Sequence, residues 1–332
     1  MSLLRSRAEL AHNRNVDSIE GKAMKPSIVV VGSVNMDLVI RAPRMPAPGE
    51  TIAGSGFQTI PGGKGANQAV AAARMGAEVH FIGSVGSDDF GRRLREGLAT
   101  DGIDLTHLAV VEDESTGVAM IILDAAGQNS IVLSPGANGR VTPEQIEACG
   151  DTIARARMLV CQLETPIPAV TRAVDIAYDK RVPVILNPAP AVPLDRSLLA
   201  KISYLIPNET EASLLSGVQV VDAETAGVAA HRLIDDGVEQ VLITLGDRGV
   251  MYALEDGVVS SAPAIRVPVV DTTGAGDTFV GTLAVELASA RPIREAIQTA
   301  QAAAALKVTK LGAQTSIPRR DEVMQFIRSR ML

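Results

Sequence analysis

The sequence of 332 residues is poor in aromatic side chains and in cysteine. It contains five Phe, three Tyr and no Trp, so the stacking platforms that hold single-stranded nucleic acid are not expected. A purine ligand would therefore lie in an aliphatic slot. The two cysteines, Cys149 and Cys161, belong to no CxxC or Cys/His cluster, which argues against structural zinc and favours a reduced, cytoplasmic setting.

Motifs of several enzyme classes are missing as well. The four histidines form no HExxH pair, and no GxSxG elbow occurs. Zinc hydrolase and serine hydrolase chemistry is therefore disfavoured.

Long apolar runs and an excess of positive charge are also absent. No apolar segment approaches the roughly 20 residues that span a bilayer. The first 24 residues lack the apolar region of a secretory signal, so we expect a soluble protein with a disordered N-terminal extension over residues 1–24. The formal net charge is -7 and the pI is about 5.3. Nucleic acids and anionic membranes are accordingly not expected partners.

Short β-branched runs alternate with helical patterns along the chain. Strand-like runs lie at 27–31, 79–83, 158–162, 182–187 and 241–245. In the helical segment TPEQIEAC, Thr142, Pro143 and Gln145 suit the N-cap, N1 and N3 positions. Such alternation predicts a three-layer α/β fold, with a mostly parallel central sheet and helices on both faces. Because no repeat or low-complexity linker divides the chain, residues 25–332 are predicted to form one large domain.

Two stretches interrupt the alternation. Residues 36–60 and 107–134 have the pattern of extended pieces separated by turns. We predict that they form a small β-sheet standing off the main sheet. Such an element is suited to act as a lid over a cleft.

The segment DTTGAGDTF, residues 271–279, is a glycine turn that leads into a helix. Gly274 and Gly276 leave backbone N–H groups open to an anion, and the helix N-terminus adds positive potential. Asp277 would stand beside that anion as a base. The alternative is that Asp277, Thr272 or Thr273 caps the helix, and the segment alone favours neither interpretation.

A second glycine turn, PGGKGANQA, opens another helix at residues 61–69. Its polar members are Lys64 and Asn67, and the Asn67 amide would orient a ligand rich in hydroxyl groups. The alternative is a plain loop with a solvated lysine. The segment matches neither the GxxxxGK[ST] phosphate loop nor the GxGxxG dinucleotide motif, so those two modes of phosphate binding are excluded here.

Polar side chains follow three of the predicted strands. Asn35 and Asp37 follow the first strand, Glu164 follows the run at 158–162, and Asn187 follows the run at 182–187. Ligands of open α/β sheets gather at the carboxyl ends of strands, and a polyol needs both donors and acceptors. A polyol site is therefore predicted at this edge, although an Asx turn would also explain Asn35 and Asp37.

Two further turns have two interpretations each. In PNETEA, Asn208 and Glu211 have the spacing of a capping box, and the same residues would suit a phosphate-bound Mg²⁺. TLGDRG, residues 244–249, would either pass under a nucleotide or form a hairpin into the next strand.

Taken together and in this order, these segments resemble the ribokinase family of carbohydrate kinases, from about Ser27 to the C-terminus. GGKGANQA and DTTGAGDTF look like its two signature regions. QLE, NPAPA, PNETEA, LITLGDRGV and LGAQTSIP are closer to the ribokinase branch than to the fructokinase or adenosine kinase branches. The resemblance implies transfer of the ATP γ-phosphate to the 5-hydroxyl of D-ribose, with Mg²⁺ and K⁺ as cofactors, by a homodimer joined through the lid strands.

The resemblance also assigns residues. It implies Asp277 as the base and an anion hole over Gly274, Ala275, Gly276 and Asp277. Sugar-binding positions are Asn35, Asp37, Gly63, Lys64, Asn67, Glu164 and Asp277. ATP-binding positions are Asn208, Thr244, Gly246, Asp247, Gly249 and Gly276, with Glu211 acting on Mg²⁺ through water. Gln301 stands where many relatives have a histidine near the adenine.

Potassium would be bound by six positions, mostly through backbone carbonyls, so that lysine side chains are not expected to interfere. These positions are Asp271, Thr273, Lys307, Lys310, Gly312 and Ser316.

The sequence leaves three alternatives open. The chain could be a sibling kinase for deoxyribose, another sugar or a nucleoside, since pocket volume cannot be read from sequence. It could be a sugar-binding protein without catalysis, although such a protein has no need of Asp277 beside an anion hole. A nicotinamide-dependent oxidoreductase suits the fold class but lacks its fingerprint.

Overall fold

The computed structural model describes residues 25–126, 128–254 and 257–330, so the predicted extension over residues 1–24 lies outside the described residues. A nine-stranded sheet forms its centre, in the order β13-β12-β11-β10-β9-β8-β1-β4-β5. The seven strands from β11 to β5 in that order are parallel, and β12 and β13 are antiparallel. The strands are β1 (Ser27–Val31), β4 (Glu78–Gly86), β5 (Asp104–Val111), β8 (Met158–Cys161), β9 (Val184–Leu186), β10 (Tyr204–Leu205), β11 (Gln240–Thr244), β12 (Val250–Ala253) and β13 (Val259–Ala262).

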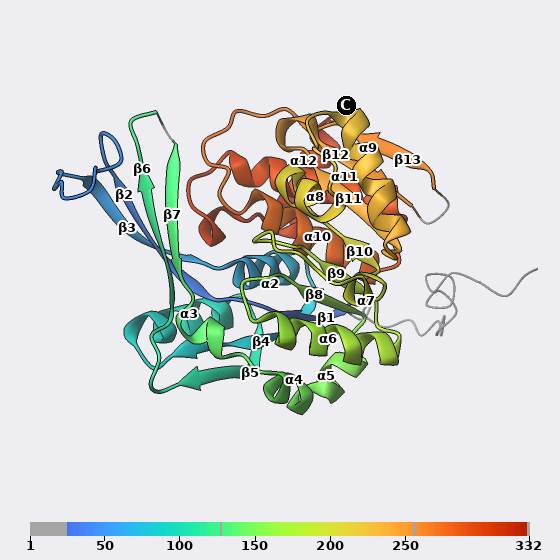
Figure 1. Cartoon of the computed structure of the whole chain (residues 1–332), viewed down its shortest axis with the longest axis horizontal. Helices are drawn as coiled ribbons and strands as arrows, with labels where there is room; N and C mark the ends of the chain where they lie inside the picture. Colours follow the sequence, from blue (N-terminus) through green and yellow to red (C-terminus); the bar gives the residue numbers. More distant parts are fainter. Residues whose placement is uncertain (1–24, 127, 255–256, 331–332) are drawn as a thin grey trace, which may run out of the picture.

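Helices cover both faces of this sheet, as the alternation predicted (Figure 1). One core holds Ile28 and Val30 of β1, and the other holds Val29 and Val31, because successive strand side chains point to opposite faces. The first core packs against α2 (Lys64–Arg74), α3 (Asp89–Thr100), α10 (Ala275–Ala288), α11 (Ile293–Val308) and α12 (Arg320–Arg330). The second packs against α4 (Pro143–Ala148), α5 (Gly150–Arg155), α6 (Ile167–Lys180), α7 (Arg196–Leu199), α8 (Glu209–Ser216) and α9 (Ala223–Asp235).

Local capping signals place two of these helices as predicted. The Thr142 hydroxyl accepts a hydrogen bond from the Gln145 N–H at 3.2 Å, at the start of α4. Asn208 and Glu211 form the predicted capping box of α8. Both helices therefore begin where side chains satisfy N–H groups that have no partner in the first turn.

A separate four-stranded sheet stands off the body where the lid was predicted, and it is called the lid below (Figure 1). Its order is β3-β2-β6-β7, with β2 (Asn35–Arg41), β3 (Ser55–Gly62), β6 (Gly117–Leu123) and β7 (Asn129–Ser134). Part of the predicted range 107–134 is wrong, since residues 107–111 belong to β5 at the edge of the central sheet. Asn35 begins β2 and Asp37 lies within it, so the alternative of an Asx turn is also wrong.

Candidate active site

The site lies at the carboxyl edge of the central sheet, where β1 has β8 on one side and β4 on the other. The chain runs from β1 to β4 and returns to β8 across β1, and such a switch point opens a crevice between strands. Ser33, after β1, donates its hydroxyl to Glu164, after β8, at 2.5 Å. The Lys64 N–H donates to the same carboxylate oxygen at 3.1 Å. Glu164 thus joins both strand ends to the start of α2.

The glycine turn before α10 leaves two backbone donors open. Gly274 is the N-cap residue at φ 76°, and no side chain caps the helix, so the proposed cap role of Asp277, Thr272 or Thr273 is wrong. The Ala275 N–H donates to the Thr272 carbonyl at 3.1 Å, which takes it out of the predicted anion hole in this structure. Within the described residues, the N–H groups of Gly276 and Asp277 have no hydrogen-bond partner.

Asp277 is a buried carboxylate oriented by two amides of α2. Its Oδ2 accepts from Asn67 Nδ2 at 2.9 Å, and its Oδ1 accepts from Gln68 Nε2 at 3.1 Å. Asp277 is 7% exposed. Because each carboxylate oxygen can accept more than one hydrogen bond, both retain capacity for a ligand proton.

A pocket of about 130 Å³ joins Lys64 and Asp277, of the predicted sugar positions, to four of the predicted nucleotide positions. The other predicted sugar positions, Asn35, Asp37, Gly63, Asn67 and Glu164, do not line it. Its lining consists of Lys64, Asn187, Ala189, Ile206, Asn208, Glu211, Thr244, Gly274, Gly276, Asp277 and Val280. A larger hollow of about 620 Å³ lies at the lid tip, between residues 41–43, 53–55 and 124–126. That hollow contains none of the predicted site residues, so the smaller pocket is the candidate site.

Carboxylates crowd around the Lys64 ammonium. Burial alone would lower the pKa of Lys64, but four surrounding carboxylates raise it, those of Asp277, Glu164, Glu211 and Asp37. Burial, and then repulsion from Glu164 and Asp277, raises the pKa of Asp37 to about 7. Burial also raises the pKa of Glu211. The site therefore concentrates negative charge around one cation.

Two of the residues predicted to bind sugar, Asn35 and Asp37, lie on the lid strand β2. The Asn35 Oδ1 accepts from Asn138 Nδ2 at 2.7 Å. A Cβ on Gly62 would lie 2.3 Å from the Asp37 carboxylate, so any side chain there would displace that carboxylate. Gly63 is the N-cap residue of α2 at φ 89°.

Asn67 combines an oriented amide with a free acceptor. Its Nδ2 donates to Asp277, while its buried Oδ1 has no hydrogen-bond partner among the described residues. A buried polar atom without a partner is costly. The Asn67 oxygen is therefore available to a hydroxyl donor on a ligand.

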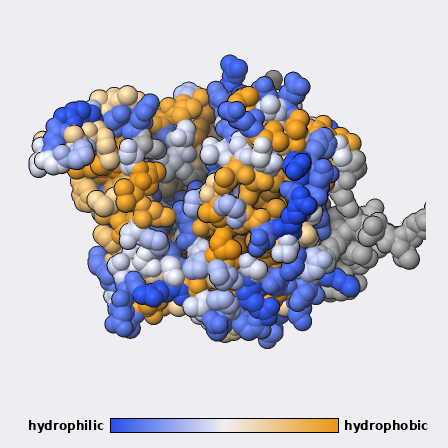
Figure 2. All heavy atoms as spheres, viewed as in Figure 1, coloured by the Kyte–Doolittle hydropathy of each residue, from blue (hydrophilic) through white to orange (hydrophobic). Residues whose placement is uncertain are grey.

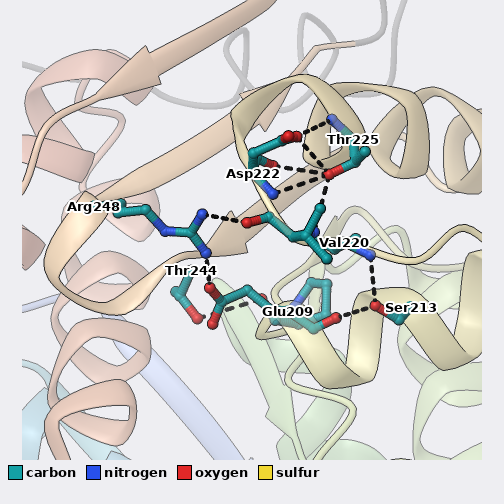
Figure 3. A network of polar contacts seen from close by, with 9 residues as sticks. Glu209, Ser213, Val220, Asp222, Thr225, Thr244 and Arg248 are labelled. Atoms are coloured by element: carbon teal, nitrogen blue, oxygen red, sulfur yellow. Dashed lines mark hydrogen bonds and ion pairs between the residues drawn. The ribbon is translucent and has the colours of Figure 1, made fainter.

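Several of the positions predicted to bind ATP lie at or just after the ends of β10 and β11. Asn208 and Thr244 pair in an isolated parallel bridge. Arg248 donates to the Val221 carbonyl at 2.6 Å and pairs with Glu209, as Figure 3 shows, which ties the turn after β11 to the start of α8. TLGDRG does form a hairpin, because β11 and β12 are antiparallel on either side of the short 3₁₀ helix η2 (Gly246–Arg248).

Within that turn, Gly246 and Asp247 are exposed and do not line the pocket, and Gly249 is buried. Gly249 has φ 99°, and a Cβ there would lie 2.1 Å from the Ala262 carbonyl. Gln301 donates to the Ala262 carbonyl at 2.9 Å and to the Pro263 carbonyl at 3.1 Å. Gly249 and Gln301 therefore both contact the end of β13 and the residue that follows it.

The predicted potassium positions are brought together in part. The Asp271 carboxylate accepts from the N–H groups of Thr273 and Gly312, each at 2.9 Å. Lys307 is fully buried, and its Nζ donates to the Asp271 carbonyl at 2.7 Å. Lys310, in contrast, pairs with Glu322 at 3.0 Å.

The contact between the Lys307 Nζ and the Asp271 carbonyl contradicts the expectation that lysine side chains do not interfere with potassium binding. The Ser316 hydroxyl also donates to the Gly312 carbonyl. Two of the carbonyls implied as potassium ligands are thus engaged by protein donors, and the residues present do not fit a potassium ion. Burial lowers the pKa of Lys307, against the opposing charges of Asp271 and Asp277.

Four polar residues that hold the site were missed from the sequence. Ser33 donates to Glu164, Gln68 donates to Asp277, and Asn138 donates to Asn35. Gln162 Nε2 donates to Gln68 Oε1 at 2.6 Å. Gln68 directly follows Asn67 in the glycine turn, and this adjacency was the available signal.

Comparisons with known proteins agree with this geometry. The model of the "pfkB family carbohydrate kinase" matches residues 25–320. The ribokinase of Haemophilus influenzae is 45% identical over 304 residues, covering 92% of this chain and 99% of that protein. The deoxyribokinase of Salmonella typhi is 36% identical over 301 residues, covering 90% of this chain and 98% of that protein.

Among solved structures, the Arabidopsis thaliana ribokinase complexed with ribose and ATP is similar with a TM-score of 0.87 and 35% identity. The likeness covers 92% of this chain and 99% of the other. Fold, site and relatives together show that the chain belongs to the pfkB family of carbohydrate kinases.

Proposed function

We propose that this chain is a kinase that transfers the γ-phosphoryl group of ATP to O5 of D-ribose. The observation that carries the proposal is the position of Asp277, oriented by two amides beside the free N–H groups of Gly276 and Asp277. Relatives named ribokinase, and the similar structure that holds ribose and ATP, support the choice of substrates.

Ribose would lie between the lid strand β2 and the start of α2. Asn35 and Asp37 would contact it from the lid side, and Gly63, Lys64, Asn67 and Glu164 from the other. The free Asn67 Oδ1 supplies an acceptor for one hydroxyl, and the carboxylates supply further acceptors. Such a set suits a neutral, hydroxyl-rich sugar.

ATP would extend from the Gly276 N–H toward Asn208 and Thr244, along the pocket that joins them. Gly246, Asp247, Gly249 and Gln301 would lie toward the nucleoside end. Mg²⁺ would travel with the phosphates, since it keeps most of its waters and takes few protein carboxylates. Glu211 lines the pocket and suits a contact through water. When bound, Mg²⁺ neutralises phosphate charge.

In this scheme Asp277 accepts the proton of the 5-hydroxyl as the oxygen bonds to the γ-phosphorus and the bond to the β-phosphate oxygen breaks. The Gly276 and Asp277 N–H groups bind the charge that spreads over the transferring phosphoryl oxygens. Positioning and electrostatic stabilisation of this kind account for most catalysis in phosphoryl transfer.

We also propose a homodimer through the lid. Figure 2 shows hydrophobic residues along the lid strands, and Phe57, Met120, Ile131 and Val132 are each more than half exposed. Apolar residues gathered on one element favour an interface.

Cys149 and Cys161 are buried as free thiols, which agrees with the cytoplasmic setting that we propose for the chain.

The substrate is tested by coupling ADP release to a spectrophotometric assay across ribose, deoxyribose, other pentoses, fructose and nucleosides. We expect the highest kcat/KM with ribose. A clear preference for deoxyribose would favour the activity of the Salmonella relative, and a preference for a nucleoside would overturn the proposal. Ribose binding without ADP release would instead favour a sugar-binding protein.

A further inference from the structure

Lys307 near the end of α11 is buried beside the glycine turn of α10. Its side chain is 0% exposed, and its Nζ donates to the Asp271 carbonyl at 2.7 Å. A lysine is rarely buried completely unless its charge has a partner. The carboxylates that face this ammonium are Asp271 and Asp277, and Asp277 is the proposed base.

Hydrogen-bond donors of this chain occupy acceptor oxygens of the surrounding turn. The Asp271 carboxylate accepts N–H groups from both sides, Thr273 before the helix and Gly312 after α11. The Ser316 hydroxyl donates to the Gly312 and Ala313 carbonyls. The turn is thus held in place by groups of this chain.

A potassium ion bound to the Asp271 carbonyl would lie directly beside the Lys307 ammonium, which donates to the same oxygen. Both are monovalent cations of similar size, and both bind carbonyl oxygens. Two like charges against one carbonyl repel, and the repulsion is strong away from water. A single cation therefore suits this position, and Lys307 supplies it.

We propose that the Lys307 ammonium is the built-in monovalent cation behind the anion-binding turn of α10, and that this kinase works without potassium. The inference rests on the proposed phosphoryl transfer at Asp277. Lys307 acts through the turn and does not touch the substrate, so it is a positioning residue. Its charge adds to the positive potential that the helix N-terminus presents to the transferring phosphoryl group.

The first test is the dependence of the rate on the monovalent cation. The full chain is assayed with ribose, ATP and MgCl₂ in KCl, NaCl or tetramethylammonium chloride at equal ionic strength. We expect rates within about two-fold of one another. Activation by potassium of more than about ten-fold would overturn the inference and leave the ribose kinase proposal intact.

The second test removes the ammonium. In tetramethylammonium chloride, Lys307→Ala is expected to lose about 10- to 100-fold in kcat, the scale of one lost electrostatic contact to the transition state. Potassium should restore at least ten-fold, since alanine opens room for the ion. Lys307→Met should lose as much and show no rescue, because its side chain still fills the space. A merely structural lysine would give loss without rescue in both variants.

A third readout does not depend on turnover. The temperature of unfolding is measured for each protein in potassium and in tetramethylammonium salts. We expect potassium to raise it in Lys307→Ala and to leave the wild type unchanged, because only the variant has a vacant cation position. The exposed Lys180, changed to Ala or Met, is the matched control. Stabilisation of the wild type by potassium, equal to that of the variant, would overturn the inference even for a chain that does not act on ribose.

Discussion

The N-terminus of α10 has two sides, and each contains a lysine in a different setting. On the sugar side, four carboxylates surround Lys64 and raise its pKa. On the other side, Lys307 is fully buried against a carbonyl oxygen, and burial lowers its pKa. The difference shows that lysine serves two purposes around one helix end. Lys64 balances negative charge in an open pocket, and Lys307 stands in for an ion.

The largest expected effect comes from Asp277, the carboxylate that faces both lysines. Asp277→Asn should lower kcat about 10²- to 10⁴-fold, the usual contribution of a general base, while ribose still binds. Steady-state kinetics and ribose titration measure the two effects, and the exposed Asp179→Asn is the control. Near-normal turnover would remove Asp277 from the role of base.

On the sugar side, Lys64→Met leaves four carboxylates without their cation. We expect the KM for ribose to rise about 10- to 100-fold, since a buried charge without its partner is strongly unfavourable. The KM for ribose is measured beside Lys180→Met, which removes an exposed lysine. An unchanged KM would show that the Lys64 charge does not organise this pocket.

The pKa of Asp37 near 7 predicts a pH-dependent stability. Asp37 has a folded pKa above its usual 3.8, so the fold carries a penalty that is complete above pH 7, shrinks as the pH falls, and vanishes below about pH 4. That penalty is at most about 4 kcal/mol. Asp37→Asn should therefore unfold at a higher temperature than the wild type at pH 8, and the gap should close toward pH 4.

Thermal unfolding between pH 4 and pH 8 measures that gap, with Asp179→Asn as the control. A gap that stays constant over this range would contradict the assigned titration of Asp37.

The smallest effect is expected away from both lysines, in the contacts of Figure 3. Arg248→Ala breaks the ion pair with Glu209 and the bond to the Val221 carbonyl. Partly exposed pairs contribute about 0–1 kcal/mol, so we expect a two- to three-fold rise in the KM for ATP and little change in kcat. A loss of ribose affinity instead would mean that the two sides are coupled through this turn.

Patterns among residues that are close along the chain predicted much of the fold. The β-branched runs became β1, β4, β8, β9 and β11, and the Thr142 cap of α4 and the capping box of α8 formed as expected. The lid boundary was wrong at residues 107–111, because β5 is an edge strand whose half-exposed pattern looks like that of a lid strand. Edge strands of both sheets have the same side-chain period of two, so only the pairing of a strand with its neighbours shows to which sheet it belongs.

The sequence by itself determined the glycine turns, the strand ends and the order of the polar residues, because short-range sterics and hydrogen bonds act between neighbours. Only the tertiary structure decided that Gln68 orients Asp277, that Ala275 gives its N–H to Thr272, and that Lys307 points inward. A helical lysine is free to reach solvent or to be buried. Its direction here follows from the loop around Asp271, which lies 36 residues earlier in the chain and is brought beside it by folding.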